Sequence, residues 1–361
     1  MRVVQVLPEL NEGGVERGVV ELNREYTKKE IISFVISAGG KLENQIQIDG
    51  GIHIKFDVCS KNIFTAFKRI SQLKSILKKI KPDIIHVRSR VPAWLVYFAN
   101  KSLNIKVVST VHGFNSVSFY SKIMTKADAV ICVSNSIKEY IQKNYNTKDE
   151  IITVIARGID LDVFNPKNID TSFVNDFKVK YNLHDKFIIS SVGRITQLKD
   201  YETFIKAIAI VKKEIPRIKA LIVGGVRSDK EDYLKSLKEL INSLDLKDNI
   251  IFTGSQSKIA EIYSLSDVVV SSSKKPESFG RAVAESIALN TPVIATNHGG
   301  VKDIIIDKVN GFFFEVGDEK ELALNIIESK KLSFDGYNYV SSTFSLDNML
   351  DSTIAVYKKV I

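Results

Sequence analysis

Residues 275–300 read KPESFGRAVAESIALNTPVIATNHGG, and two glutamates stand in this stretch in different surroundings. Glu285 is the only charged residue in the run AVAESIAL, whose other residues suit a buried helix. Glu277 lies eight residues earlier, directly after a proline and three residues before a glycine. The proline and the glycine predict a loop at Glu277, followed by a helix that begins near Phe279 and ends before the next proline.

The spacing of the two carboxylates suits an extended ligand with hydroxyl groups at both ends. Eight residues of helix span about 12 Å, which is close to the distance between the hexose and the ribose of a nucleotide-sugar. Carboxylates bind vicinal hydroxyls well, and the free N–H groups of Phe279, Gly280 and Arg281 at the helix start suit a sugar or a phosphate. A salt bridge between Arg281 and Glu285 is the alternative role for the buried carboxylate, and the spacing leaves both open.

The rest of the chain alternates short apolar runs with amphipathic stretches. Runs such as RVVQVL, PDIIHV, FIISSVG, ALIVGG and DVVVSSS predict parallel strands that are buried on both faces. The fold class is therefore α/β, with two doubly wound, Rossmann-like domains in tandem that face each other across a cleft at the carboxyl ends of their strands. We expect domains at 1–165 and 166–344, and an amphipathic helix at 345–361 for which a return to the N-terminal domain is one option.

Composition narrows the classes of function. The chain has 361 residues, a net charge of +9 and 44% hydrophobic residues, so it suits a soluble protein with two cores that handles anions. It has no apolar run of spanning length, no signal peptide pattern, no zinc-site spacing and no nucleic-acid-binding motif. The two cysteines, Cys59 and Cys132, fit a cytoplasmic protein, and Cys132 in the apolar run AVICVS is expected to be an inert buried thiol.

The segment ESFGRAVAESIALNTPVIAT resembles the E-x7-E motif of the family 4 retaining glycosyltransferases, which have the GT-B fold. The resemblance covers nearly the whole chain. It implies that Glu277 faces the hydroxyls of the transferred sugar and that Glu285 holds the ribose. It also implies transfer of a hexose from a nucleotide-sugar to a hydroxyl, with no metal and no other cofactor. Asp303 departs mildly from the family, which often has a glutamate there.

Four more residues fit the same site. Gly14 lies in a Gly-Gly turn that resembles the family's phosphate-side loop, although a plain tight turn is the alternative. Arg194 and Lys199 follow the strand at Phe187 and match the cation pair that neutralises the leaving diphosphate, whereas a solvated loop is the alternative for Lys199. His112 follows the strand KVVSTV and is expected to donate to the sugar or phosphate, with a helix-capping role as its alternative.

Other histidines carry less information. His53, His184 and His298 show no comparable pattern, and His86 is expected in or near the core.

Basic residues in the first domain suggest where an acceptor binds. The stretch HVRSRVPAW is similar to a subset of bacterial lipopolysaccharide core enzymes, and Arg88 and Arg90 in it are candidates for an acceptor phosphate. A solvated basic loop is equally compatible with them. Arg157 suits either a phosphate contact or a pair with Asp160, and the sequence leaves both open.

Residues 62–83 predict an amphipathic helix. Its apolar stripe is expected to pack on the sheet, and it consists of Phe64, Phe67, Ile70, Leu73, Leu77 and Ile80. Its basic face consists of Lys68, Arg69, Lys74, Lys78 and Lys79. This face suits peripheral contact with the anionic inner face of the cytoplasmic membrane, while an ordinary solvated face is the alternative.

The predicted partners are a nucleotide-sugar donor, UDP- or GDP-linked, and a glycan or glycolipid acceptor in lipopolysaccharide or other cell-envelope assembly. Nucleic acid is not expected. The base is expected to be bound by backbone groups near 253–257. A GT-B nucleotide-sugar epimerase and a non-catalytic nucleotide-sugar-binding regulator are the alternatives.

Overall fold

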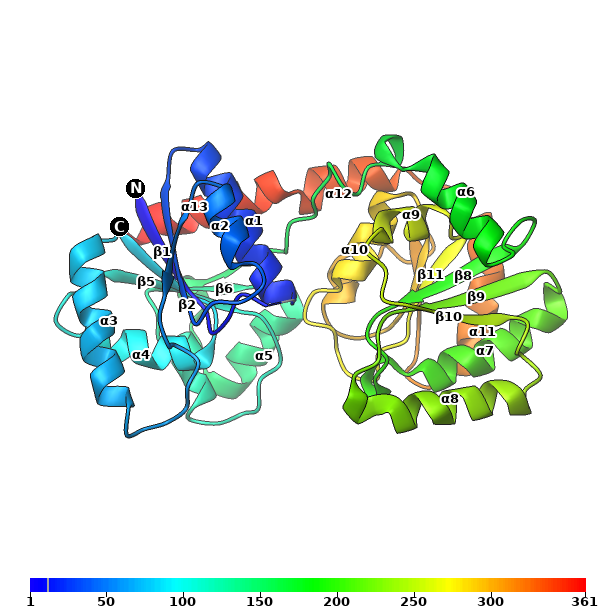
Figure 1. The fold of residues 1–361 in the computed structure, drawn as a ribbon, viewed down its shortest axis with the longest axis horizontal. Helices are drawn as coiled ribbons and strands as arrows, with labels where there is room; N and C mark the ends of the chain where they lie inside the picture. Colours follow the sequence, from blue (N-terminus) through cyan, green and yellow to red (C-terminus); the bar gives the residue numbers. More distant parts are fainter. Residues whose placement is uncertain (12) are drawn as a thin grey trace. The chain divides into compact units, whose positions relative to one another are not determined.

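The computed structural model describes residues 1–11 and 13–361 and divides the chain into two compact units. Unit 1 comprises Met1–Gly158 and Leu346–Ile361, and unit 2 comprises Ile159–Ser345. The division falls at Gly158 rather than after residue 165, because Ile159 forms a β-bridge with Ser345 and donates its N–H to the Phe344 carbonyl at 2.7 Å. The fold class predicted from the sequence, two parallel-sheet α/β units, is confirmed (Figure 1).

Unit 1 is built on a seven-stranded parallel sheet in the order β3-β2-β1-β4-β5-β6-β7. Its strands are β1 (Arg2–Val6), β2 (Ile32–Ser37), β3 (Ile52–Lys55), β4 (Ile84–Val87), β5 (Lys106–Val111), β6 (Ala129–Cys132) and β7 (Ile152–Val154). Its helices are α1 (Gly14–Lys28), α2 (Glu43–Ile48), α3 (Ala66–Ile80), α4 (Arg90–Asn100), α5 (Asn135–Tyr145) and α13 (Leu346–Val360). Short 3₁₀ turns occur at Ser121–Thr125 and Asp149–Ile151.

Unit 2 repeats the plan with a six-stranded parallel sheet in the order β10-β9-β8-β11-β12-β13. Its strands are β8 (Phe187–Val192), β9 (Ile218–Val223), β10 (Ile250–Gly254), β11 (Val268–Ser271), β12 (Val293–Thr296) and β13 (Gly311–Phe314). Its helices are α6 (Thr171–Lys180), α7 (Tyr201–Glu214), α8 (Glu231–Ser243), α9 (Ile259–Ser264), α10 (Arg281–Ala288), α11 (Glu319–Glu328) and α12 (Gly336–Phe344). Its 3₁₀ turns are Pro166–Asn168, Gln197–Lys199, Ser228–Lys230, Gly300–Asp303 and Ser329–Lys331.

The strand order indicates where a ligand site is expected in each unit. In both sheets the order reverses beside the first strand, between β1 and β4 in unit 1 and between β8 and β11 in unit 2. Open α/β sheets bind ligands outside the carboxyl ends of the strands at this reversal. The loops after β1, β4, β8 and β11 are therefore the first places to look for a site.

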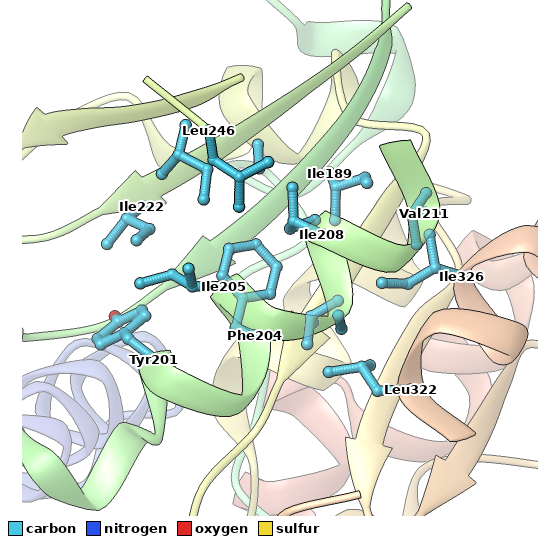
Figure 2. Packing of buried hydrophobic residues seen from close by; sticks show 14 of the residues in the cluster. Ile189, Tyr201, Phe204, Ile205, Ile208, Val211, Ile222, Leu246, Leu322 and Ile326 are labelled. Atoms are coloured by element: carbon cyan, nitrogen blue, oxygen red, sulfur yellow. The ribbon is translucent and has the colours of Figure 1, made fainter. Parts of the chain in front are cut away.

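The main core of unit 2 lies between its sheet and helices α7, α8 and α11 (Figure 2). Helix α7 contributes the fully buried Tyr201, Phe204, Ile205 and Ile208, which recur at the spacing of one helical face. Consecutive residues of β8 point to opposite faces of the sheet. Ile189 therefore packs in this core, whereas Ile188 packs in a second cluster with α6 and α9. This packing fixes α7 and the loop that precedes it.

The C-terminal helix α13 belongs to unit 1. The Tyr357 hydroxyl lies 2.7 Å from the Tyr26 hydroxyl of α1 and 2.5 Å from His86 Nδ1 of β4. His86 is fully buried, as the sequence predicted, and its other ring nitrogen lies 2.6 Å from Thr110 Oγ1. The return of the last segment to the first domain, one option predicted from the sequence, is therefore seen in the structure.

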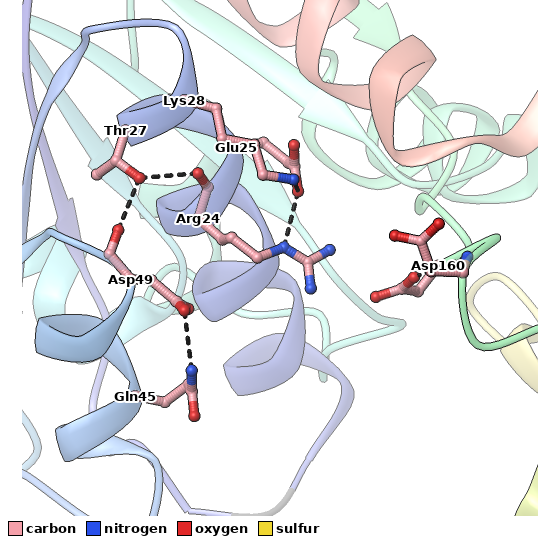
Figure 3. A network of polar contacts seen from close by, with 8 residues as sticks. Arg24, Glu25, Thr27, Lys28, Gln45, Asp49 and Asp160 are labelled. Atoms are coloured by element: carbon pink, nitrogen blue, oxygen red, sulfur yellow. Dashed lines mark hydrogen bonds and ion pairs between the residues drawn. The ribbon is translucent and has the colours of Figure 1, made fainter.

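Helix α1 is also tied to α2 through polar contacts (Figure 3). The Thr27 hydroxyl lies 2.7 Å from the Asp49 carbonyl, which follows α2, and Gln45 Nε2 donates to Asp49 Oδ1 at 2.8 Å. The position of α1 matters because Gly14 is its first residue.

The prediction for residues 62–83 is wrong in part. Phe64 and Phe67 are 90% and 83% exposed, whereas Leu73 and Leu77 are fully buried as expected. Arg69, expected on the basic face, is only 6% exposed. Helix α3 begins at Ala66, so Phe64 lies before it, and the buried stripe runs through Arg69, Leu73 and Leu77 instead.

No helix within residues 1–11 and 13–361 is long and apolar enough to cross a membrane.

Candidate active site

In unit 2 the loops after β8 and β11 bring two predicted catalytic residues together. Lys199 Nζ lies 2.6 Å from Glu277 Oε1, and the Ser273 hydroxyl donates to the same oxygen at 2.7 Å. Lys199 ends the 3₁₀ turn after β8, and Ser273 and Glu277 follow β11. The two loops meet because β8 and β11 are neighbours in the sheet.

The electrostatics keep Glu277 ionised. Burial alone raises the pKa of the Glu277 carboxyl, but the Lys199 ammonium and the hydrogen bonds from Lys199 and Ser273 outweigh it, so this pKa is lowered overall. The side chains of Lys199 and Glu277 stay 29% and 31% exposed, so a ligand can reach both. An ionised, accessible carboxylate beside a cation suits binding of sugar hydroxyls next to a phosphate.

Gly299 and Gly300 hold the backbone of Glu277. Glu277 forms an isolated β-bridge with Gly299, and the Gly300 N–H donates to the Glu277 carbonyl at 2.7 Å. Gly299 has a φ of +75°, and a Cβ there would lie 2.4 Å from that carbonyl oxygen. Only glycine fits this approach without displacing the loop.

His298 supports the same loop, although its sequence pattern gave no reason to select it. Its Nε2 lies 2.8 Å from the Ser273 carbonyl, which can only accept, so this nitrogen carries the proton. His298 thereby holds Ser273, the residue that donates to Glu277. Its place directly before the Gly299-Gly300 pair, just past the carboxyl end of β12, was the signal in the sequence.

Helix α10 carries the second carboxylate. Arg281 Nε lies 2.7 Å from Glu285 Oε1, and these side chains are 18% and 9% exposed. The salt bridge that the sequence left open is therefore formed. Helix α10 begins at Arg281, not at Phe279, because Gly280 caps it with a φ of +101° and Phe279 is buried against Phe344.

Arg194 lies in the loop after β8 but does not join Glu277. Its side chain is exposed and forms no hydrogen bond or ion pair with any residue that the structure describes. Gly193 precedes it, and a Cβ at Gly193 would lie 2.9 Å from Lys199 Cε, so the stem of Lys199 passes directly over this loop. Arg194 and Lys199 thus lie in the same loop, but of the two only Lys199 forms an ion pair with a residue that the structure describes, namely Glu277.

In unit 1, Arg157 links two predicted residues. Its Nη1 donates to the Gly14 carbonyl, and its Nη2 lies 3.1 Å from His112 Nδ1. A Cβ at Gly14 would lie 2.8 Å from Arg157 Nη1, so the missing side chain makes room for the guanidinium. Gly14 and His112 were predicted from the sequence, but the role of Arg157 in joining them was not.

The contact with Arg157 decides the protonation of His112. A guanidinium has no acceptor, so His112 Nδ1 must accept, and the proton of the neutral ring sits on Nε2. Burial, followed by the Arg157 and Arg88 charges, holds the pKa of His112 well below its usual value. Its Nε2 is buried without a hydrogen-bond partner among the described residues. His112 thus presents one N–H donor.

Arg88 and Arg90, the two candidates for binding a phosphate of the sugar acceptor, have different surroundings. Arg88 is 6% exposed, and its guanidinium bonds Gln5 Oε1 and Thr110 Oγ1. A solvated loop therefore does not describe Arg88, and burial lowers its pKa. Arg90 begins α4, donates to the Ser121 hydroxyl at 3.1 Å and lies 5.6 Å from the ring centre of Tyr120.

Two family models match the chain. Residues 12–163 match "Glycosyltransferase Family 4", and residues 174–334 match "Glycosyl transferases group 1".

Individual relatives resemble the chain over most of its length. A solved glycosyltransferase from Rickettsia africae is 32% identical with a TM-score of 0.91 and covers 99% of this chain and 98% of its own. The capsular polysaccharide biosynthesis glycosyltransferase CapM of Staphylococcus aureus is 29% identical over 336 residues, 86% of this chain and 82% of CapM. The structure of HepE from Anabaena in complex with UDP has a TM-score of 0.86 at 18% identity, covering 99% and 100% of the two chains, which shows a shared fold.

Proposed function

The chain belongs to the family 4 glycosyltransferases with the GT-B fold, and we propose that it transfers a hexose from a nucleotide-sugar to a hydroxyl with retention of configuration. The observation that carries this proposal is the cluster of Lys199, Ser273 and Glu277 at the carboxyl ends of β8 and β11. The UDP bound by HepE supports a nucleotide-sugar donor, and UDP is the nucleotide we favour.

The proposed reaction needs charge stabilisation at the leaving group. The bond between the anomeric carbon and the phosphate oxygen breaks, and its electron pair stays on the diphosphate. Lys199 and Arg194 stabilise this charge, which removes the need for a metal ion. The acceptor oxygen bonds the anomeric carbon on the same face, and its proton passes to the leaving phosphate.

The carboxylates bind and do not attack in this proposal. Glu277 accepts hydrogen bonds from hydroxyls of the transferred sugar, since it is ionised and already paired with Lys199. Glu285 accepts from the ribose while Arg281 holds its orientation. Phe279, Gly280 and Arg281 supply the helix start on the donor side. His112 donates its Nε2–H to the sugar or a phosphate, and Gly14 makes room for the Arg157 guanidinium at the start of α1, on the side proposed for the diphosphate.

The acceptor side is proposed more broadly. CapM supports a cell-envelope glycan as the product, and a glycolipid acceptor in lipopolysaccharide assembly is a narrower form of the same proposal. Arg88 and Arg90 are its phosphate candidates. We further propose that the cytoplasmic enzyme contacts the anionic membrane peripherally through the lysines of α3, since Lys68, Lys78 and Lys79 are exposed.

The test is the configuration of the transferred sugar. The enzyme is incubated with an α-linked UDP- or GDP-hexose and envelope glycolipid, and the anomeric proton of the product is followed by NMR. We expect an α-linked product, whereas a β-linked product contradicts retention. Isomerisation of the donor without any transfer would instead favour the epimerase, and binding without turnover would favour the regulator.

A further inference from the structure

Unit 1 contains a cavity that the proposed mechanism does not use. It has a volume of about 310 Å³ and lies between α3, α4 and the loop before the 3₁₀ turn at Ser121–Thr125. Its wall is mainly apolar and aromatic, and it includes Ile63, Ala66, Ile70, Trp94, Phe98 and Tyr120. Helix α4 begins with Arg90, so the cavity adjoins the acceptor-side loop.

Trp94 forms one wall with its ring faces. Its ring is stacked on Phe98 with 5.8 Å between centroids and on Tyr120 with 6.4 Å. Its one polar atom is satisfied, because Nε1 donates to the Tyr120 carbonyl at 3.1 Å. This wall therefore offers apolar surface and no spare hydrogen-bond donor from the indole.

Arg69 lines the same cavity and is buried. Its Nη2 donates to the Asn62 carbonyl at 2.9 Å, while Nε and Nη1 have no hydrogen-bond partner among the residues described. The nearest carboxylate oxygen, Asp57 Oδ2, is 3.9 Å from Nε, and the other oxygen of Asp57 accepts from the Ser60 N–H at 2.9 Å. Arg69 is therefore a buried cation whose ion pair with Asp57 is long, and its two N–H groups without a hydrogen bond are costly unless a further acceptor meets them.

The mouth of the cavity combines positive charge with apolar side chains. Lys61 lines it and is exposed, and Ile63 on the rim is 74% exposed. Phe64 and Phe67, beside them along the chain, are 90% and 83% exposed. An occupant that satisfies these features has one anionic group and one apolar chain.

We propose that this cavity binds a lipid phosphate, with the hydrocarbon chain along Trp94 and Phe98 and the phosphate on Arg69 and Lys61. The Nε–H and Nη1–H groups of Arg69 have no hydrogen-bond partner among the described residues, and a charged donor of this kind forms a strong hydrogen bond to a phosphate oxygen. A peptide fits less well, because the apolar wall would leave its backbone groups without partners. Identifying this lipid as the sugar acceptor rests on the proposed function, whereas the binding itself does not.

The chain supplies its own probe for a test, since Trp94 is its only tryptophan. Trp94 fluorescence is titrated with dodecyl phosphate below its critical micelle concentration, with no nucleotide-sugar present. We expect a saturable change that Arg69→Gln weakens by about tenfold or more, because a charge-assisted contact is lost. Lys143→Gln is the control, an exposed lysine of α5 in the same unit, and is expected to bind as the wild type does.

Two further ligands separate the parts of the proposal. Dodecyl maltoside has the chain without the charge, and inorganic phosphate has the charge without the chain. Equal affinity for the maltoside and no effect of Arg69→Gln would overturn the phosphate assignment. Equal affinity for inorganic phosphate would overturn the lipid assignment.

Ile63→Ser is a second variant that tests the cavity if Arg69→Gln fails to fold, since Ile63 is exposed on the rim and its substitution does not disturb the core. It is expected to weaken dodecyl phosphate binding and to leave binding of butyl phosphate unchanged. Unchanged dodecyl phosphate binding in both variants overturns the proposal. Normal lipid binding together with no sugar transfer would count against the proposed function alone.

Discussion

At the level of single residues, Lys199 forms an ion pair with Glu277, and its proposed second role is to stabilise the leaving phosphate. We expect Lys199→Ala and Arg194→Ala each to lower kcat by about a hundredfold, because charge stabilisation in a closed site contributes several kcal/mol. Steady-state rates at saturating donor measure this. Lys212→Ala, at an exposed ion pair with Asp245, is the control. A near-normal kcat in either variant would show that its cation does not act on the leaving group.

Arg157 offers a test of the protonation of His112. Arg157→Gln removes a charge that lowers the pKa of His112, so we expect this pKa to rise while remaining below the usual value because of burial. An NMR titration of the imidazole protons measures the shift. An unchanged pKa would mean that burial and the Arg88 charge set it and that the Arg157 guanidinium does not face Nδ1 in solution.

Part of the candidate site could be predicted from the sequence, because polar residues that follow predicted strands were expected to lie at the same edge of the sheet. Lys199 and Glu277 were placed at the ends of apolar runs, and the structure brings them within hydrogen-bond distance. His298 and Arg157 were not assigned their roles, because each acts through a contact with a residue distant in the sequence. Such contacts depend on which strands are neighbours, and the order of strands is not encoded in local patterns.

At the level of elements, the loop before α10 depends on one glycine conformation. Gly299→Ala combines an unfavourable φ of +75° with a Cβ that would lie 2.4 Å from the Glu277 carbonyl. We expect a loss of about 1–3 kcal/mol in the free energy of unfolding, measured by chemical denaturation. Gly317→Ala is a matched control, since Gly317 has a φ of +81° but open space around its Cβ.

The difference between the two glycine variants isolates the close approach from the backbone strain. Equal losses would mean that the loop moves aside freely, and the support of Glu277 by Gly299 would then have no energetic basis.

Helix α3 shows where periodicity failed. The apolar residues of 62–83 suggested a stripe that included Phe64 and Phe67, yet both are exposed. The sequence pattern does not show that the helix begins at Ala66 or that a buried arginine takes the position of an apolar residue. Buried charges are rare, so a pattern based on hydrophobicity assigns them to the surface.

At the level of the whole chain, the apolar runs sufficed to predict two parallel α/β units. They did not show that α13 packs on unit 1, because that depends on contacts such as Tyr26 with Tyr357, which are far apart in the sequence. The structure divides the chain at Gly158, where Ile159 forms a bridge with the distant Ser345, whereas the sequence pattern predicted a boundary after residue 165.

Two histidines in unit 1, the fully buried His86 and the partly buried His112, give the stability a dependence on pH. Burial, together with the Arg88 charge, holds the pKa of His86 well below its usual value, and that of His112 is lowered as well. The unfolded chain therefore takes up protons first as the pH falls below about 6.5, so unfolding becomes easier. We expect the free energy of unfolding to fall by about 1 kcal/mol per histidine between pH 6.5 and 5.5, because the unfolded imidazole goes from half to almost full protonation over this range.

Thermal unfolding of the wild type across this pH range checks the prediction. His184→Gln, a histidine variant in unit 2, is the control and is expected to show the same pH dependence as the wild type. A stability that stays constant or rises from pH 6.5 to 5.5 would show that His86 and His112 are not held neutral in the folded protein.

The central claim is that the segment from Glu277 to Glu285 binds a nucleotide-sugar, and thermal shift measurements with UDP- and GDP-sugars test it most directly. A donor at a hundred times its Kd adds about 2.7 kcal/mol, which corresponds to a Tm increase of about 5–10 °C. We predict this increase for the wild type with at least one donor, and a clearly smaller one for Glu285→Ala, because its carboxylate holds the ribose. Equal shifts for the wild type and a folded Glu285→Ala variant would reduce Glu285 to a salt-bridge partner of Arg281 and contradict the account.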